Sequence, residues 1–179
     1  MSTSPFYRAI QAGNLPLVQR LLAAGASLEG ERDRLTPWLL PQSTPLIEAI
    51  RSHHLPIAAL LLELGADPNA FTRTGTTPLA AAVQLDDDEA VRLLLEWGAD
   101  VNFKTNAQMA SPLQRAAYDG QENLVRLLLA HGARPDTVLQ NDVSSLIRIR
   151  GPILQMLIDA GGRAPDDILK LLRDGAALP

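Results

Sequence analysis

The chain has 179 residues, of which 46% are hydrophobic, and this is enough to build a continuous core within the size of one domain. It contains no cysteine, which excludes disulfide frameworks, thiolate nucleophiles and cysteine-ligated zinc sites. The net charge of −4 opposes general attraction to nucleic-acid phosphates and to anionic membranes.

The N-terminal residues, MSTSPFYRAIQAG, lack the basic region and the apolar run of a secretory signal peptide. No later segment approaches the length that a membrane-spanning helix needs. We therefore expect a cytoplasmic protein. Aromatic residues make up only 4% of the chain while Leu and Ala abound, which favours an almost all-helical protein over a β-sandwich.

Four segments of the chain align with one another without internal gaps. They are SPFYRAIQAGNLPLVQRLLAAGA, TPLIEAIRSHHLPIAALLLELGA, TPLAAAVQLDDDEAVRLLLEWGA and SPLQRAAYDGQENLVRLLLAHGA. Each begins with Ser or Thr and reaches a Gly 21 positions later; the pairs are Ser4 and Gly25, Thr44 and Gly65, Thr77 and Gly98, and Ser111 and Gly132. The starts are 40, 33 and 34 residues apart, so the chain is built from repeats.

Each repeat is expected to contain two helices. A Ser or Thr followed by Pro predicts an N-cap with Pro at the first helical position, where no amide donor is wasted. Five positions later a small residue recurs that lets the neighbouring repeat approach closely; these are Ala9, Ala49, Ala82 and Ala116.

The second helix carries apolar residues at i, i+1, i+4 and i+5, which predicts a buried stripe. In the first two repeats these residues are Leu17, Val18, Leu21 and Leu22, and Ile57, Ala58, Leu61 and Leu62. The Gly that follows each stripe is expected to end the helix in a left-handed conformation.

A period near 33 residues with Thr-Pro-Leu and Gly-Ala signatures resembles the ankyrin repeat over about residues 4–162. The resemblance implies an all-α solenoid of helix-turn-helix units with projecting β-turns. We expect one domain over 1–179, with repeats at about 4–36, 44–76, 77–110 and 111–143. A degenerate repeat follows at 144–162, and 163–179 is expected to form a C-terminal cap.

The sequence departs from the family pattern at two kinds of position. The family usually has His after Thr-Pro-Leu, and we expect its hydrogen bonds to be lost here, where the matching residues are Tyr7, Ile47, Ala80 and Gln114. His53 and Asp86 replace the Gly that usually separates the two helices. A left-handed backbone at these two residues would cost about 1 kcal/mol relative to Gly.

The first connection between repeats is unusually long. It runs 19 residues from Gly25 to Thr44, against 12 from Gly65 to Thr77. The inserted segment, 31–42, places Trp38 in an apolar cluster near Arg32 and Arg34. Either this loop contacts a partner or Trp38 folds back over the first repeat.

No arrangement of residues indicates catalysis or metal binding. The histidines, His53, His54 and His131, lack metal-ligand spacing, and the acidic run 86–89 sits where a helix begins and lacks the pattern of a calcium loop. The repeat geometry brings no Ser, His and acid together, and no phosphate-binding motif is present. We therefore expect no enzyme activity, no cofactor and no metal.

The resemblance implies that a partner protein binds at the turn tips and on the exposed side of the first helices. The residues we expect to contact it are Arg32, Arg34, Trp38, Arg51, Arg73, Thr74, Lys104, Asn106 and Tyr118. The turn edge is locally basic, which favours a partner with an acidic patch through electrostatic steering.

We therefore predict a cytoplasmic adaptor or inhibitor, monomeric when alone, that masks a partner protein. By resemblance, a toxin-neutralising or immunity protein is an alternative. A scaffold subunit of a larger complex is another, and it would purify with its complex. Nucleic-acid binding is favoured only by the basic turn edge, and the net charge opposes both nucleic acid and membrane.

Overall fold

The computed structural model describes residues 4–29, 43–104, 110–139, 149 and 151–163. Helices joined by turns make up this part of the chain, which contains no β-strand, so the predicted all-α class is confirmed. The chain divides into two compact units, Met1–Asp100 and Val101–Pro179. The expectation of one domain stays a prediction.

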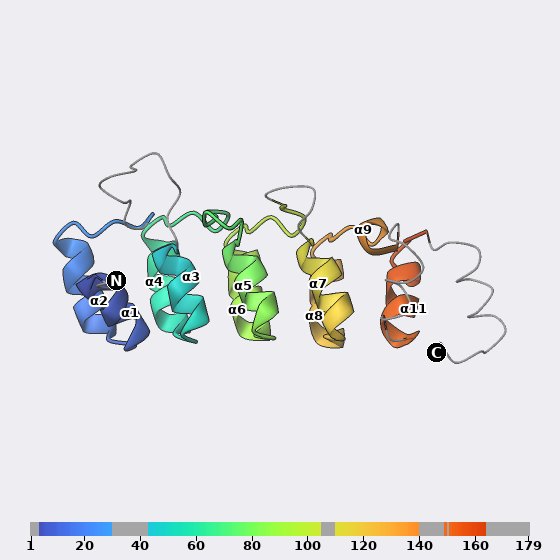
Figure 1. Cartoon of the computed structure of the whole chain (residues 1–179), viewed down its shortest axis with the longest axis horizontal. Coiled ribbons are helices and arrows are strands. Elements are labelled where there is room, and N and C mark those ends of the chain that lie inside the picture. Colours follow the sequence, from blue (N-terminus) through green and yellow to red (C-terminus); the bar gives the residue numbers. More distant parts are fainter. Residues whose placement is uncertain (1–3, 30–42, 105–109, 140–148, 150, 164–179) are drawn as a thin grey trace. The chain divides into compact units, whose positions relative to one another are not determined.

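Three helix pairs form the first unit. The first helices are α1 (Pro5–Gln11), α3 (Pro45–Arg51) and α5 (Pro78–Gln84), and the second helices are α2 (Leu15–Ala23), α4 (Leu55–Glu63) and α6 (Asp88–Glu96). Helix α3 packs against both α1 and α5, and every second helix packs on the first helix of its own pair (Figure 1). The pairs therefore stack into two layers, as the resemblance implied.

The second unit continues the pattern with α7 (Pro112–Asp119) and α8 (Glu122–Ala130), which pack together. Helix α9 (Asp136–Leu139) packs against α7, and α11 (Gly151–Asp159) packs against α8. The repeat pattern did not predict α9. Helix α11 falls within the degenerate repeat, whereas 144–148 and the predicted cap from residue 164 onward lie outside the described residues.

The predicted N-cap residues, each followed by Pro at the first helical position, precede all four first helices. The side-chain oxygens of Thr44, Thr77 and Ser111 accept hydrogen bonds from the amides three residues later, at 3.2, 3.1 and 3.2 Å. Ser4 stands at the N-cap of α1, but its buried hydroxyl makes no hydrogen bond within the described residues. Pro5, whose missing amide leaves one donor fewer to satisfy, still opens this helix.

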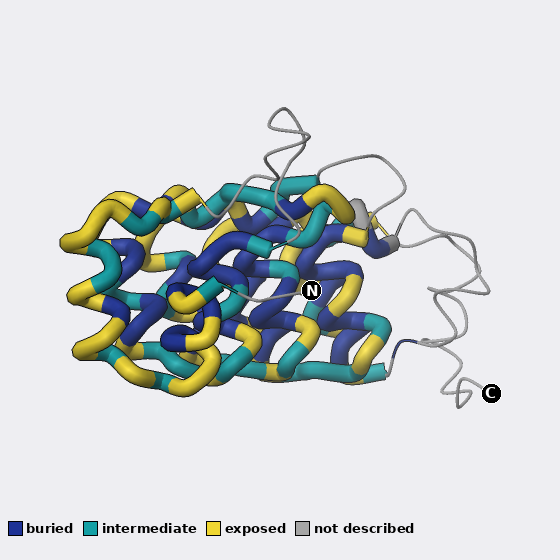
Figure 2. The backbone as a smooth tube through the Cα atoms, turned by 60° about the vertical axis from the view of Figure 1, so that its left-hand side comes forward, coloured by how far each residue is buried: buried dark blue, intermediate teal, exposed yellow. Residues whose placement is uncertain are grey.

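The core lies where the repeat pattern predicts it. The recurring alanines, Ala9, Ala49, Ala82 and Ala116, are all buried, as is the apolar stripe of α4. In α2, by contrast, Leu17 is 36% exposed although the matching Ile57, in the next repeat, is buried. No described repeat precedes α2, so one flank of its stripe stays open. Figure 2 shows buried and exposed segments alternating along the helices.

Left-handed backbone occurs at the predicted positions. The terminating glycines, Gly25, Gly65, Gly98 and Gly132, have φ between 83° and 94°. His53 and Asp86 have φ of 57° and 55°, so both hold the strained conformation that Gly adopts freely.

Candidate functional site

A tight turn over residues 72–76 presents two of the predicted contact residues in the first unit. The Gly75 amide donates to the Thr72 carbonyl at 2.8 Å, and the Thr72 amide donates to the Thr76 carbonyl at 3.0 Å. The Thr76 amide donates to the Thr72 hydroxyl at 3.1 Å. Thr72 itself is only 1% exposed. The buried Thr72 therefore holds Arg73 and Thr74 at the exposed tip of a turn with fixed geometry.

At the tip of this turn, Arg73 is the residue whose side chain is available to bind a partner. The Thr74 hydroxyl lies 2.9 Å from the Thr72 hydroxyl and is engaged in the turn. The Arg73 guanidinium makes no hydrogen bond or ion pair within the part of the chain that the structure describes. A guanidinium presents donors in a planar fork that matches a carboxylate.

The exposed side of the first helices, here called the first-helix face, adds two further arginines. Arg8 lies on α1 and Arg51 at the end of α3, and both are exposed. The acid on this face is Glu48, whose oxygens accept from Gln11 Nε2 at 2.7 Å and from the Ser43 hydroxyl at 3.3 Å. Both donors are neutral, so the arginines leave this side of the first unit with a positive surplus.

The structure does not gather these charges into one cluster. The turn 72–76 lies at the end of the repeats where the first helices begin, whereas Arg51 ends α3 at the opposite end (Figure 1). A seven-residue helix spans about 10 Å. Arg51 and Arg73 therefore lie along an extended strip and not in a pocket.

Two predicted contact residues lie in the second unit, and both are half-buried. Lys104 Nζ donates to Gln114 Oε1 at 3.0 Å, and the same oxygen accepts from the Ser111 amide at 2.8 Å. Lys104 thus fastens its turn to α7. Tyr118 sits in the last turn of α7.

Four predicted contact residues lie outside the described residues. They are Arg32, Arg34, Trp38 and Asn106. Their roles stay predictions, as does the choice between the two roles of segment 31–42.

The expected loss of hydrogen bonds at the family's His position is wrong at two of its four sites. The Tyr7 hydroxyl donates to the Ser43 carbonyl at 2.7 Å, and Gln114 completes a capping box with Ser111. Both side chains are long and polar, so they reach the turn that a His would reach. The apolar Ile47 and Ala80 have no side-chain group that can do so.

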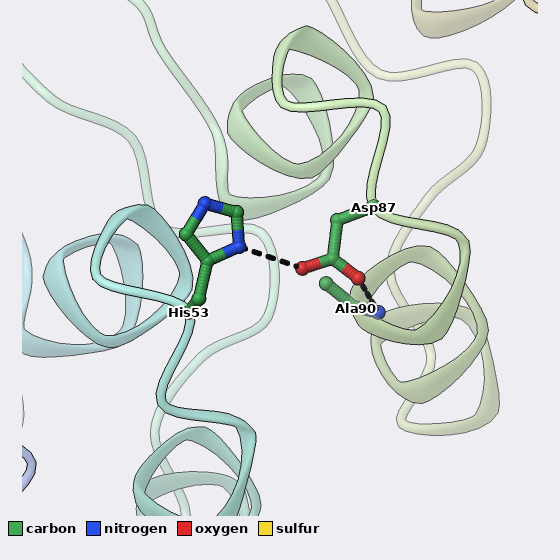
Figure 3. A network of polar contacts seen from close by, with 3 residues as sticks. All are labelled: His53, Asp87 and Ala90. Carbon is green, nitrogen blue, oxygen red and sulfur yellow. Dashed lines mark hydrogen bonds and ion pairs between the residues drawn. The ribbon is translucent and has the colours of Figure 1, made fainter.

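His53, which replaces glycine, and the adjacent His54 connect neighbouring helix pairs. Asp87 caps α6 by accepting from the Ala90 amide at 2.9 Å, and its other oxygen lies 3.3 Å from His53 Nδ1 (Figure 3). His54 donates from Nε2 to the Gln11 carbonyl at 3.0 Å. The acidic run starts α6, as predicted, and the described residues contain no group of three or more His, Cys, Asp or Glu arranged to hold a metal ion.

Two surface residues that the sequence analysis missed are Leu64 and Trp97, which are 52% and 43% exposed. Each directly precedes the terminating Gly of its repeat. The matching residues are Ala24 and His131, so the register places two bulky apolar side chains outside the predicted stripe. That comparison was the signal that could have identified them.

Comparison with protein-family models matches residues 6–105 and 71–141 to a family described as ankyrin repeats (3 copies). These ranges cover more than half of the chain. No curated protein matches. Among the described helices, none combines the length and the apolar character needed to cross a membrane.

Proposed function

The chain belongs to the ankyrin-repeat family, and on that premise we propose that it acts in the cytoplasm as an adaptor or inhibitor that binds and masks a partner protein. Ankyrin repeats are generally protein–protein interaction modules. The contact surface that we propose is the turn 72–76 together with the first-helix face of the first unit.

The observation that carries this proposal is the state of Arg73. Its turn is held by three backbone donors and a buried threonine, whereas its guanidinium has no partner in the described part of the chain. The backbone of this turn is already fixed, so it loses little conformational freedom when the side chain at its tip binds, which favours affinity. Such a residue suits recognition better than support of the fold.

The charges indicate the chemistry of the partner. Arg8 and Arg51 are exposed on the first helices and Arg73 is exposed at the tip of the turn 72–76, while Glu48 on α3 is engaged by neutral donors. A partner surface with Asp and Glu side chains at a similar spacing would form charge-assisted hydrogen bonds with this strip. Electrostatic steering would speed the encounter and make it sensitive to salt.

The test is capture of partners from the native host by the intact protein, with an Arg73→Glu variant and an Arg20→Glu control. Arg20 is exposed on the second helix α2, so the control carries the same charge change on the other layer. We expect a stoichiometric partner with the parent and the control, and its loss with Arg73→Glu. Equal capture by all three proteins would contradict the proposed surface.

The same preparation distinguishes an inhibitor from a scaffold subunit. An adaptor or inhibitor is expected to be soluble and monomeric when it is purified without its partner. A scaffold subunit would instead aggregate alone and copurify with several proteins. Sedimentation of the isolated chain separates these two outcomes.

A further inference from the structure

The second helices of the first unit carry an apolar patch on their outer side. Leu60 lies on α4 and Leu64, four residues later, is the C-cap of that helix; Leu93 and Trp97 hold the matching positions on α6 and at its C-cap. Residues four apart share one side of a helix. Leu60 and Leu93 are half-buried, whereas Leu64 and Trp97 are among the most exposed large hydrophobic residues described.

Hydrogen bonds bring the ends of the two helices together. Asn69, five residues beyond Leu64, donates from Nδ2 to the carbonyl of Gly98 at 3.3 Å, and Gly98 directly follows Trp97. Asn69 Oδ1 also accepts from the Asp100 amide at 2.7 Å. These bonds tie the turn after α4 to the end of α6, so Leu64 and Trp97, which hold matching positions in consecutive repeats, face the same surface of the first unit. We call these four apolar residues the outer patch.

Carboxylates surround the outer patch. Glu63 and Asp67 flank Leu64, and Glu96 and Asp100 flank Trp97; all four are exposed. Glu63 and Glu96 make no hydrogen bond or ion pair within the described residues. The nearest cation by register is Arg92, one turn before Glu96. The patch is therefore apolar at its centre and acidic at its rim.

We infer that the outer patch is a second docking surface, which accepts a basic amphipathic helix of another protein. Apolar side chains of that helix would cover Leu64 and Trp97 while its Lys and Arg residues meet the four carboxylates. The positive charges of such a helix complement the negative charges of the rim. Trp97 and Leu64 then serve as the aromatic and aliphatic anchors at the centre of the contact. A surface that stayed in water would gain nothing from two large apolar side chains at matching positions.

The acidic rim argues against other occupants. Anionic lipid headgroups and nucleic-acid phosphates would be repelled by the carboxylates. A second copy of the chain that docked patch to patch would place like charges opposite one another. A basic helix alone matches both the apolar centre and the charge of the rim.

This surface is separate from the one proposed for the first partner. The outer patch lies on the second-helix layer, whereas Arg8 and Arg51 lie on the first-helix layer. Two proteins could therefore bind at once, and an adaptor joins proteins in this manner. A result that contradicts one of the two proposed surfaces therefore does not contradict the other.

The fluorescence of Trp97 can report binding at the outer patch. The chain contains two tryptophans, so Trp38→Phe leaves Trp97 as the single reporter. The probe is a synthetic helical peptide of about 18 residues with Leu at i, i+3, i+4 and i+7 and Lys on the flanks. The control peptide keeps the Leu positions and carries Glu on the flanks. We expect a saturable blue shift of Trp97 emission with the Lys peptide, and binding at least about tenfold weaker with the Glu peptide.

Three variants in the Trp38→Phe background locate the binding. Leu64→Ser and the double change Glu63→Lys, Glu96→Lys are each expected to weaken the Lys peptide about tenfold, and the charge effect should shrink as salt rises. Arg73→Glu is the matched control and should bind the peptide like the parent. Circular dichroism and thermal melting verify that each variant is folded.

The inference is overturned if the Lys peptide gives no saturable shift, or if both peptides bind equally well. It is also overturned if Leu64→Ser and the Lys double variant bind like the parent, because the peptide would then sit elsewhere. Tighter binding in Arg73→Glu, where a carboxylate replaces a cation, with no effect of the other variants would place the peptide on the first partner's surface.

Discussion

The imidazole of His54 lies directly over Gly13, so that a Cβ built on Gly13 would stand 2.7 Å from His54 Cε1. The same ring donates from Nε2 to the Gln11 carbonyl at 3.0 Å. Gly13 has φ of 67°, in the left-handed region that favours Gly. The first helix pair is therefore joined to the second through a contact that only glycine permits.

Gly13→Ala tests this contact. The Cβ forces the ring of His54 away and breaks its hydrogen bond, and the left-handed backbone is strained as well. We expect the free energy of unfolding to fall by about 2–3 kcal/mol in chemical denaturation. The control is Gly65→Ala, where φ is 92° but no atom lies within 4 Å of the Cβ. Strain alone should lower the free energy of unfolding there by about 1 kcal/mol.

A double variant separates strain from the clash. In Gly13→Ala, His54→Ala the clash is absent, so the free energy of unfolding should fall by less than the sum of the two single changes. Strict additivity of the two changes would show that the Cβ introduced by Gly13→Ala does not disturb His54.

The capping residues supply a matched pair. Ser111 accepts from the Gln114 amide and belongs to a capping box, whereas the Ser4 hydroxyl is buried and has no partner among the residues that the structure describes. Ser111→Ala should lower the free energy of unfolding by about 1 kcal/mol or more. Ser4→Ala should leave it unchanged or raise it slightly, since an unsatisfied buried hydroxyl is removed. Equal losses in thermal melts would mean that Ser4 caps α1 after all.

Asp86 offers a site for stabilisation. Its φ of 55° is strained for a residue with a Cβ, and the matching residues Gly13 and Gly120 adopt it freely. Asp86→Gly should raise the free energy of unfolding by about 0.5–1 kcal/mol. Asp88→Gly, in the first turn of α6, should lower it by a similar amount because helical backbone disfavours Gly. A loss of stability in Asp86→Gly would show that its side chain outweighs the strain.

Thr72 connects the fold to binding. Thr72→Val keeps the shape of the side chain but removes the oxygen that accepts from the Thr76 amide. The turn should loosen, and affinity for the captured partner should fall by about threefold to tenfold while Arg73 stays present. Titration calorimetry measures this affinity. An unchanged affinity would mean that the turn need not be preformed.

Much of the fold could be predicted from the sequence because each repeat carries local signals. The Ser-Pro and Thr-Pro pairs gave the starts of α3, α5 and α7, and the glycines gave the ends of the second helices. These signals act through the backbone of neighbouring residues. Helix α9 has no counterpart in the other repeats, so the repeat pattern did not predict it.

Contacts between repeats were harder to predict. The hydrogen bond from Tyr7 joins residues 36 positions apart, and the family pattern at that site concerns His. From the sequence, His53 was interpreted as a replacement for glycine and both His53 and His54 as residues without metal-ligand spacing, although both join neighbouring pairs. Leu64 and Trp97 are exposed because of their position in the stack of repeats. Their exposure was hard to predict because both directly follow Leu-rich helices whose apolar residues are mostly in the core.

The central claim is tested most directly by the affinity of the captured partner for the parent, Arg73→Glu and Arg20→Glu proteins at low and at physiological salt. We expect Arg73→Glu to weaken binding by about tenfold or more at low salt, with a smaller loss at higher salt, and Arg20→Glu to bind like the parent. If Arg73→Glu binds as tightly as the parent at low salt, the first-helix face and its turn are not the surface through which this protein acts.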